Sequence, residues 1–376
     1  MHFSGCPHGA WVLLALTTAQ SRGGFEAEVG WNWRVPPNEA SGPWRAFFRD
    51  RDPQAEGWNR TPGDPGVAAL RGHLREHGCM RGLRAVSPGR PDYAARAARA
   101  FRRDGFVVVE DVLSAGHVAA LRNATARILG RIFEADPEGS FGGGAGKLPH
   151  RYSLGDASAT KSNLHMPEYC ALIDLPTTTP VLQAIFGSST YQLAGAGGDV
   201  VLAGAIEYQS LHMDAIWGPH EGHVQDLPVP PVVTVNFVLE DVTAMNGPIR
   251  KVPGSHRWHE PPLTLSDEPS WMKVSTLCPL RAGSAIFRDN RCWHGGTPNL
   301  ADRARVLPNV EYFAPGGLPS LGWLDRPSMP FERWQSLSPL ARYLARGVVA
   351  PPGIEIPGMA QYSPGAIIDL MPFMAQ

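Results

Sequence analysis

The sequence lacks the features that mark several large classes of protein. Its five cysteines are widely spaced and include no CxxC pair, which argues against a thiolate zinc site and a disulfide framework and favours mostly free thiols. The formal net charge is −1, without the surplus of Lys and Arg that nucleic-acid binding requires. No apolar run approaches the roughly 20 residues that cross a bilayer. We therefore expect no nucleic-acid partner and no membrane span.

Targeting information is also sparse. One apolar run, Trp11–Leu16, resembles the central part of a signal peptide, but no Lys or Arg precedes it. We therefore expect a cytoplasmic protein, with a weak N-terminal targeting segment as the alternative. The sequence leaves the oligomeric state open between a monomer and a homodimer.

What the chain has in abundance is glycine and proline, 41 and 36 residues, which favour turns and short strands. We expect an irregular N-terminal extension over residues 1–94, partly disordered or packed on the core. Residues 95–315 are expected to form the main domain. Residues 316–376 form a Pro-rich tail that we expect to pack on it.

The main domain begins with helical patterns and continues with strands. The pattern predicts a helix over residues 93–103 that ends at Gly105, a strand over 106–109, and a second helix with Ser114 as its N-cap. Further strands are expected at 200–206, 232–239, 285–287 and 306–313. Many short strands between turns predict a mainly β fold with flanking helices, of the sandwich or barrel kind.

Three side chains suggest a metal site. In extended backbone, residues two apart point to the same side, so His212 and Asp214 can reach one ion together. His294 follows a predicted strand and supplies a second imidazole. Two imidazoles and one carboxylate form the facial triad that suits non-haem iron(II), with positions left open for other ligands.

Arg305 lies eleven residues beyond His294 and opens a predicted strand. Its planar guanidinium fits a carboxylate with two parallel hydrogen bonds, which the distal carboxylate of 2-oxoglutarate requires. Arg303 is the competing residue, although its Ala-Asp-Arg setting is typical of an ordinary turn.

These segments together resemble the phytanoyl-CoA dioxygenase family. The resemblance covers about residues 95–315, and its ordered motifs are more specific together than any one of them. It is carried by the helix and strand over 101–114, the HxD at 212–214, the NGPxRxxPGSH stretch within 239–256, and the segment 294–305 with its distal His and trailing Arg.

The resemblance implies a double-stranded β-helix (jelly-roll) core and the use of iron(II), 2-oxoglutarate and O2. It also implies that His212, Asp214 and His294 bind the metal and that Arg305 anchors the co-substrate. Some relatives carry a Ser two residues after the distal His, where this chain has Gly296, and Thr297 is the candidate substitute. The implied reaction hydroxylates a C–H bond of a small organic substrate, such as an acyl-CoA, a lipid or a specialised metabolite, with succinate and CO2 as co-products.

Two other functions stay open: a cupin-like metal enzyme that does not use 2-oxoglutarate, and a catalytically silent jelly-roll binding protein. Several further residues are candidates for roles near the metal, namely His220 and His223 as alternative ligands, Trp217 as a pocket residue, and His165 and Lys161 as residues over the pocket. His256 is expected to be structural. The Gly-rich stretch 141–147 lacks the spacing of a phosphate-binding loop and is expected to be a lid or a disordered loop.

Overall fold

The computed structural model describes residues 65–135, 151–155, 163–206, 208–214, 223–316 and 328–354. Among these, the helices of at least one α-turn are α3 (Pro65–His77), α4 (Tyr93–Asp104), α5 (Ala115–Ala135), α6 (Pro167–Cys170), α7 (Thr179–Phe186), α8 (Ser270–Lys273), α9 (Phe331–Gln335) and α10 (Pro339–Leu344). No described helix is long and apolar enough to cross a membrane.

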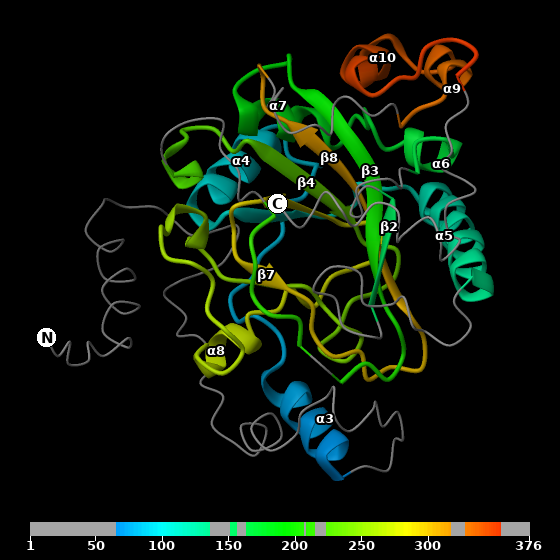
Figure 1. The fold of residues 1–376 in the computed structure, drawn as a ribbon. Coiled ribbons are helices and arrows are strands. Elements are labelled where there is room, and N and C mark those ends of the chain that lie inside the picture. Colours follow the sequence, from blue (N-terminus) through cyan, green and yellow to red (C-terminus); the bar gives the residue numbers. More distant parts are fainter. Residues whose placement is uncertain are drawn as a thin grey trace, which may run out of the picture.

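The described strands form a large sheet and a small one (Figure 1). The large sheet is antiparallel throughout, in the order β1-β6-β4-β8-β3-β2. Its strands are β1 (Phe106–Val109), β2 (Arg151–Gly155), β3 (Gln192–Val201), β4 (Val232–Phe237), β6 (Ala285–Asp289) and β8 (Arg305–Phe313).

The small sheet consists of β5 (Arg250–Lys251) and β7 (His294–Gly295). Isolated bridges extend it on both sides, because His212 pairs with His294 and Thr276 pairs with Arg250. Four short extended segments therefore lie side by side. Two antiparallel sheets built from alternating segments of one chain constitute the double-stranded β-helix core expected from the sequence.

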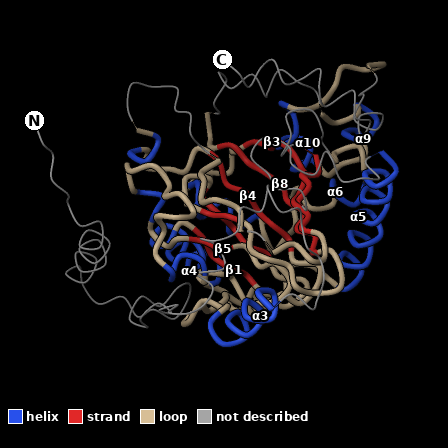
Figure 2. The backbone as a smooth tube through the Cα atoms, turned by 60° about the horizontal axis from the view of Figure 1, so that its bottom comes forward, coloured by secondary structure: helices blue, strands red, loops and turns tan. Residues whose placement is uncertain are grey.

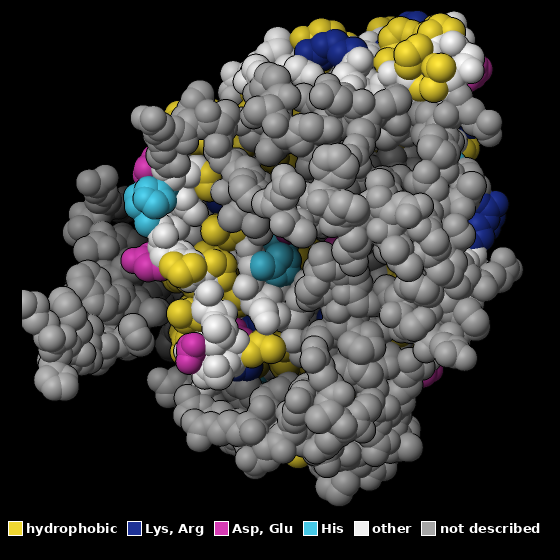
Figure 3. All heavy atoms as spheres, viewed as in Figure 1, with side chains coloured by type: hydrophobic (Ala, Val, Ile, Leu, Met, Phe, Trp, Pro, Cys, Tyr) yellow, Lys and Arg dark blue, Asp and Glu magenta, His cyan; other side chains and the backbone are white. Residues whose placement is uncertain are grey.

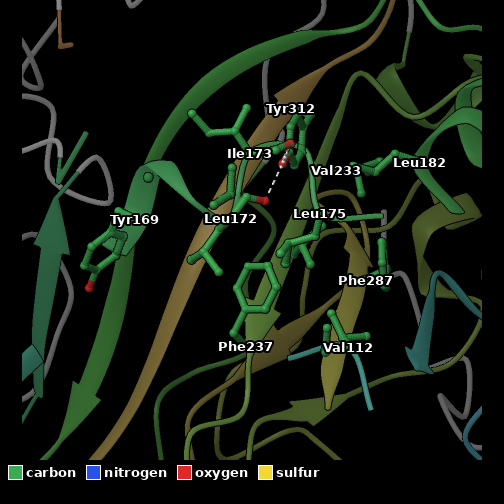
Figure 4. Close-up of a cluster of buried hydrophobic side chains, with 14 of the residues drawn as sticks. Val112, Tyr169, Leu172, Ile173, Leu175, Leu182, Val233, Phe237, Phe287 and Tyr312 are labelled. Carbon is green, nitrogen blue, oxygen red and sulfur yellow. Dashed lines mark hydrogen bonds between the residues drawn. The ribbon is translucent and has the colours of Figure 1, made fainter. Parts of the chain in front are cut away.

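Helices cover the outer face of the large sheet (Figures 1 and 2). Outward-facing side chains such as Val235, Phe237 and Phe287 are buried there against residues of α4, α5, α7 and α10. Figure 4 shows part of this cluster, in which the Tyr312 hydroxyl donates a hydrogen bond to the carbonyl of Ile173 at 2.7 Å. This packing supports the large sheet on its outer face, and the inner face lines the interior.

The helix and strand that open the main domain follow the sequence prediction closely. Helix α4 ends at Gly105, whose φ of 83° lies in the left-handed region that glycine adopts without steric cost. The Ser114 hydroxyl accepts a hydrogen bond from the backbone N–H of His117 at 3.2 Å, as an N-cap does. The strands predicted at 232–239, 285–287 and 306–313 correspond to β4, β6 and β8.

Some predictions of local structure were wrong. The strand expected at 200–206 is β3, which covers Gln192–Val201 and ends where the predicted run begins. Its Gly-rich first part lacks the β-branched residues that indicate a strand. In the extension, residues 65–77 form helix α3 rather than irregular structure, and its Leu70 and Leu74 are buried.

The cysteines differ from the expectation of mostly free thiols. Cys79 and Cys278 form a disulfide across 199 residues of sequence, while Cys170 and Cys292 are buried free thiols. The bond ties the segment after α3 to the loop that precedes β6. Spacing along the chain carries no signal for a contact between two residues so far apart, which is why the sequence did not indicate it.

Candidate metal centre and active site

The small sheet places two imidazoles side by side. The backbone N–H of His212 donates to the carbonyl of His294 at 3.0 Å, and the N–H of His294 donates back to the carbonyl of His212 at 3.0 Å. Residues opposite each other in an antiparallel pair present their side chains on one face. The two ring centroids accordingly lie 4.2 Å apart.

Backbone carbonyls fix the tautomer of both rings. His212 Nδ1 lies 3.0 Å from the carbonyl oxygen of Ser210, and His294 Nδ1 lies 3.0 Å from that of Cys292. A carbonyl oxygen only accepts, so each Nδ1 carries the proton and each Nε2 presents a lone pair. An outer hydrogen bond of this kind orients a metal-binding imidazole and raises its basicity.

Asp214 adds a carboxylate to the two imidazoles. Its Oδ2 lies 3.2 Å from His294 Nε2, and its Oδ1 lies 3.7 Å from His212 Nε2. One ligand atom from each of the three residues lies within 4.8 Å of the others. Among the described residues this is the one group of three His, Cys, Asp or Glu side chains with that spacing. The structure thus brings together the three residues that the sequence predicted.

The protonation states suit a divalent cation. Burial opposes ionisation of Asp214, but the neighbouring His294 and Arg288 outweigh it and hold the pKa of this carboxyl well below its usual range. Burial and the nearby Lys251 hold the pKa of His294 well below its ordinary value. An ionised carboxylate and a neutral imidazole are the forms that bind metals. Asp214 and His294 therefore have the protonation states that suit a divalent cation such as iron(II).

Arg305 lies at the start of β8 with its side chain buried. Its Nε donates to the carbonyl of Gly247 at 2.8 Å and its Nη2 donates to the same oxygen at 2.5 Å, while Nη1 is buried and has no hydrogen-bond partner among the described residues. Burial, and then Arg151, lower the pKa of Arg305 to about 10. One edge of the guanidinium is bonded to the backbone, and the Nη1 donor is unused. Such an arginine is suited to bind an incoming carboxylate.

A second arginine stands beside it. Arg151 on β2, Val201 on β3 and Arg305 on β8 are paired in register, so the two arginines lie on the same face of the large sheet. Arg151 donates to the carbonyl of Thr297 at 2.7 Å, and a Cβ on residue 296 would collide with its guanidinium. Gly296 therefore leaves the space that Arg151 fills. Sequence reasoning missed this residue, because β2 lies outside every recognisable motif.

Thr297 is buried, and its hydroxyl donates to the carbonyl of Pro248 at 2.6 Å. The hydroxyl then has only acceptor capacity left, which is the wrong polarity for a carboxylate. Arg303 is 78% exposed and contacts Glu240 and Asp302 only at 3.8 and 3.9 Å. Of the two arginines weighed from the sequence, Arg305 is thus the one that faces the interior.

His165, His223 and His256 are described and do not belong to the group of metal-binding side chains, and the other candidates lie outside the described residues. His223 stacks on His259 with ring centroids 4.6 Å apart and is not one of the grouped metal-binding side chains. His256 is buried with its Nε2 3.2 Å from the carbonyl of Arg102, in keeping with a structural role. Trp217, His220, Lys161 and the stretch 141–147 lie outside the described residues.

Three charged residues near the triad were not anticipated. Arg288 on β6 donates from Nη1 to Asp214 Oδ2 at 2.5 Å and lies 3.9 Å from Glu311 on β8, while Lys251 on β5 is opposite His294. Glu311 could have been found, because alternation along β8 puts it on the same face as Arg305. On the face seen in Figure 3, histidine side chains reach the surface, and the His212 side chain is 35% exposed.

The chain has partial similarity to several known proteins. The chain is 27% identical over 175 residues to ectoine dioxygenase from Sphingopyxis alaskensis, a match that covers 44% of this chain and 50% of that protein. The chain thus matches only about half the length of that relative.

Solved structures with partial similarity include the epimerase SnoN in complex with Fe3+, alpha ketoglutarate and nogalamycin RO. It is 26% identical, with a TM-score of 0.46, over 60% of this chain and 85% of that one. HygX from Streptomyces hygroscopicus, solved with nickel, 2-oxoglutarate and hygromycin B, is 19% identical, with a TM-score of 0.40, over 58% of this chain and 86% of that one.

The sequence model of one family matches more than half of the chain. The match runs over residues 101–307 and so contains the first strand, the HxD, the NGPxRxxPGSH stretch, the distal His and Arg305. Dioxygenase chemistry with iron and 2-oxoglutarate is the chemistry of that family. The chain belongs to the phytanoyl-CoA dioxygenase (PhyH) family of oxidoreductases.

Proposed function

We propose that this protein is an iron(II)- and 2-oxoglutarate-dependent dioxygenase that hydroxylates a C–H bond of a small organic substrate. The proposal rests on one observation, that His212, Asp214 and His294 form one group. The buried arginine pair, Arg151 and Arg305, lies on the neighbouring large sheet. His212, Asp214 and His294 are the residues we assign to the metal. Bound iron(II) supplies the activation of O2 and the oxidative decarboxylation of the keto acid to succinate and CO2.

The protein's own residues position the reactants. We assign Arg305 to the distal carboxylate of 2-oxoglutarate, with its spare Nη1 as the donor that forms the new hydrogen bond. Arg151 lies beside it and adds a second positive charge. Three protein ligands would leave coordination positions for 2-oxoglutarate and O2. The His212 and Asp214 side chains are each 35% exposed, so these positions would be reached from the surface of the protein.

The carboxylate at position 214 favours hydroxylation over halogenation. A halogenating relative needs a small residue in place of the carboxylate to make room for a halide, whereas this chain has Asp214. Arg288 holds the Asp214 carboxylate in place through the 2.5 Å hydrogen bond to Oδ2. We therefore assign hydroxylation, with the substrate left to experiment.

The test is release of succinate by the purified protein. With iron(II), 2-oxoglutarate and O2, we expect slow uncoupled succinate formation that metabolite extracts accelerate, and none with the His294→Ala protein. If neither coupled nor uncoupled succinate forms, the proposal is wrong. A cupin-like enzyme independent of 2-oxoglutarate would instead stay active after Arg305→Ala. A silent binding protein would fail to retain iron(II) on anaerobic reconstitution.

The cytoplasm is the compartment expected from the sequence, and a monomer or homodimer the expected state. The Cys79–Cys278 disulfide is more typical of an oxidising compartment. Thiol labelling of the protein taken from its native cells would decide between them, because an accessible Cys79 thiol would be labelled only in a reducing compartment.

A further inference from the structure

Lys251 occupies an unusual place next to the metal centre. It is directly opposite His294 in the register of β5 and β7, and His294 is in turn opposite His212. Paired residues present their side chains on one face, so these three form a row across the small sheet. The neighbouring Arg250 points to the other face, where its guanidinium donates to the Glu268 carboxylate at 2.5 Å.

The amino group of Lys251 is buried without a hydrogen-bond partner among the described residues. Of the two carboxylates that act on it, Asp289 is held by the guanidinium of Arg291 at 2.7 Å and Asp214 by that of Arg288 at 2.5 Å. A buried amino group without a hydrogen-bond partner is costly in either protonation state, so its presence here points to an acidic ligand that supplies the missing partner.

Arg288 lies on the large sheet, opposite Lys251, and also reaches the metal-binding residues. Its Nη1 lies 2.5 Å from Asp214 Oδ2 and 3.3 Å from His294 Nε2. Its charge acts on that of Lys251. The charged groups that act on Arg305 are different ones, namely Arg151, Asp199 and Glu240. The interior therefore has two separate groups of basic side chains, each with acidic neighbours, which are Asp214 and Glu311 for Arg288 and Asp199 and Glu240 for Arg305.

We propose that Lys251 and Arg288 form a second carboxylate-binding site, beside the metal, that receives the carboxylate of the primary substrate. The inference rests on the proposed function, since it presumes that 2-oxoglutarate occupies the Arg305 site. Because Arg288 touches two of the metal-binding residues, the oxidised carbon must lie close to this carboxylate. The substrate is then a small carboxylic acid. An acyl-CoA thioester does not fit, because its acyl carbon carries no free carboxylate.

The experiment compares the wild-type protein with Lys251→Met and, as a second variant, Arg288→Met. One measurement is the affinity of the manganese-loaded protein for 2-oxoglutarate, followed by tryptophan fluorescence. The other is the binding of butyrate to protein saturated with manganese and N-oxalylglycine, followed by the paramagnetic relaxation of the butyrate methyl protons. Loss of a charge-assisted hydrogen bond predicts weakening by at least about tenfold.

The two measurements identify the source of the carboxylate. If the variants bind butyrate at least about tenfold more weakly and 2-oxoglutarate normally, the site belongs to the primary substrate, as proposed. If they lose 2-oxoglutarate affinity instead, the site binds the keto acid and the proposal is overturned. Unchanged affinity for both, or no butyrate binding by the wild type together with unchanged 2-oxoglutarate affinity, overturns the proposal.

Stability separates a binding lysine from a structural one. Met has similar length and needs no hydrogen-bond partner, so Lys251→Met should raise the Tm of the ligand-free protein by roughly 2–4 °C. The matched control is Lys273→Met. Lys273 is also buried, but it donates to the carbonyl of Leu265 at 2.7 Å and lies 3.5 Å from Glu268. Its loss should lower the Tm and leave butyrate binding unchanged.

Failure of this inference and failure of the proposed function are distinguishable. Succinate release by the wild type tests the function without reference to Lys251. Binding of butyrate tests the second site without turnover. If the wild-type protein releases succinate but Lys251→Met leaves the affinity for both carboxylates unchanged, the proposed function stands and the second site is rejected.

Discussion

The two faces of the large sheet are equally buried and differ in chemistry. Along β4, Val233, Val235 and Phe237 face the helices, whereas Thr234 and Asn236 alternate with them and face the interior. The Thr234 hydroxyl lies 2.7 Å from the Asn290 side-chain oxygen and 3.0 Å from the Glu311 carboxylate, and it donates its single proton to one of them. Burial alone therefore does not show which residues stabilise the fold and which serve the site. Hydrogen bonding and charge make that distinction.

The largest expected effect on the inner side comes from removal of a metal-binding residue. His294→Ala should abolish metal retention, a loss greater than the roughly 10- to 100-fold typical of changes outside the metal ligands. The chain should still fold, because the outer face is untouched. Metal content after anaerobic loading and circular dichroism measure the two effects. The control is His259→Ala, since the His259 side chain is 50% exposed and stacks on His223.

The matching change on the outer side should affect stability only. Phe287→Ala removes a fully buried ring and should lower the free energy of unfolding by about 3–5 kcal/mol. The folded fraction should keep the wild-type affinity for metal and 2-oxoglutarate. Phe287→Leu should cost under about 1.5 kcal/mol. A weakened metal site in folded Phe287→Ala protein would show that the two faces are coupled.

Arg305 tests the inner face at the co-substrate end. Arg305→Ala should weaken 2-oxoglutarate binding by about 2–5 kcal/mol, the cost of removing one partner of a buried charge pair. Titration of manganese-loaded protein measures this. Arg303→Ala, two residues away on the surface, should change the affinity by less than about 0.5 kcal/mol. Equal losses in both variants would mean that bulk charge, and not the buried guanidinium, attracts the co-substrate.

A smaller effect is expected for the second arginine. Arg151→Ala should weaken 2-oxoglutarate binding by about 1.5–3 kcal/mol, as expected for a hydrogen bond to a charged group. Gly296→Ser alone should be destabilising, because its Cβ would collide with the Arg151 guanidinium. The double variant should recover stability and part of the affinity. If the two single effects on stability simply add, the packing of Arg151 against Gly296 is unimportant.

The sequence predicted the features that are local. Short patterns, such as Gly after a helix or alternation along a strand, predict helix α4 and strands β1, β4, β6 and β8. The ordered motifs from His212 to Arg305 depend on short patterns in the same way. The glycine-rich start of β3 was missed, because its extended shape depends on pairing with β2 and β8 on either side. The Cys79–Cys278 bond was missed for the same reason, since only the folded chain brings its ends together.

The same division applies to the site. The three residues we assign to the metal lie in recognisable motifs, so their spacing could be interpreted directly. Arg151, Arg288 and Lys251 were overlooked, because each reaches the interior from a strand whose partners are set by tertiary structure. Lys251 even lies within the NGPxRxxPGSH stretch, at one of its variable positions. A motif that accepts any residue at a position predicts no role for a charged residue at that position.

The reciprocal backbone hydrogen bonds between His212 and His294 have a consequence for engineering. They set the separation of the two imidazoles through the main chain, so that distance does not depend on the third ligand. Asp214 comes two residues later, and within the described part of the chain its backbone N–H donates to the carbonyl of Asn290 at 2.9 Å. Replacing the side chain at position 214 should therefore retune the metal's reactivity on an unchanged scaffold, which makes this chain a convenient host for new oxidative chemistry.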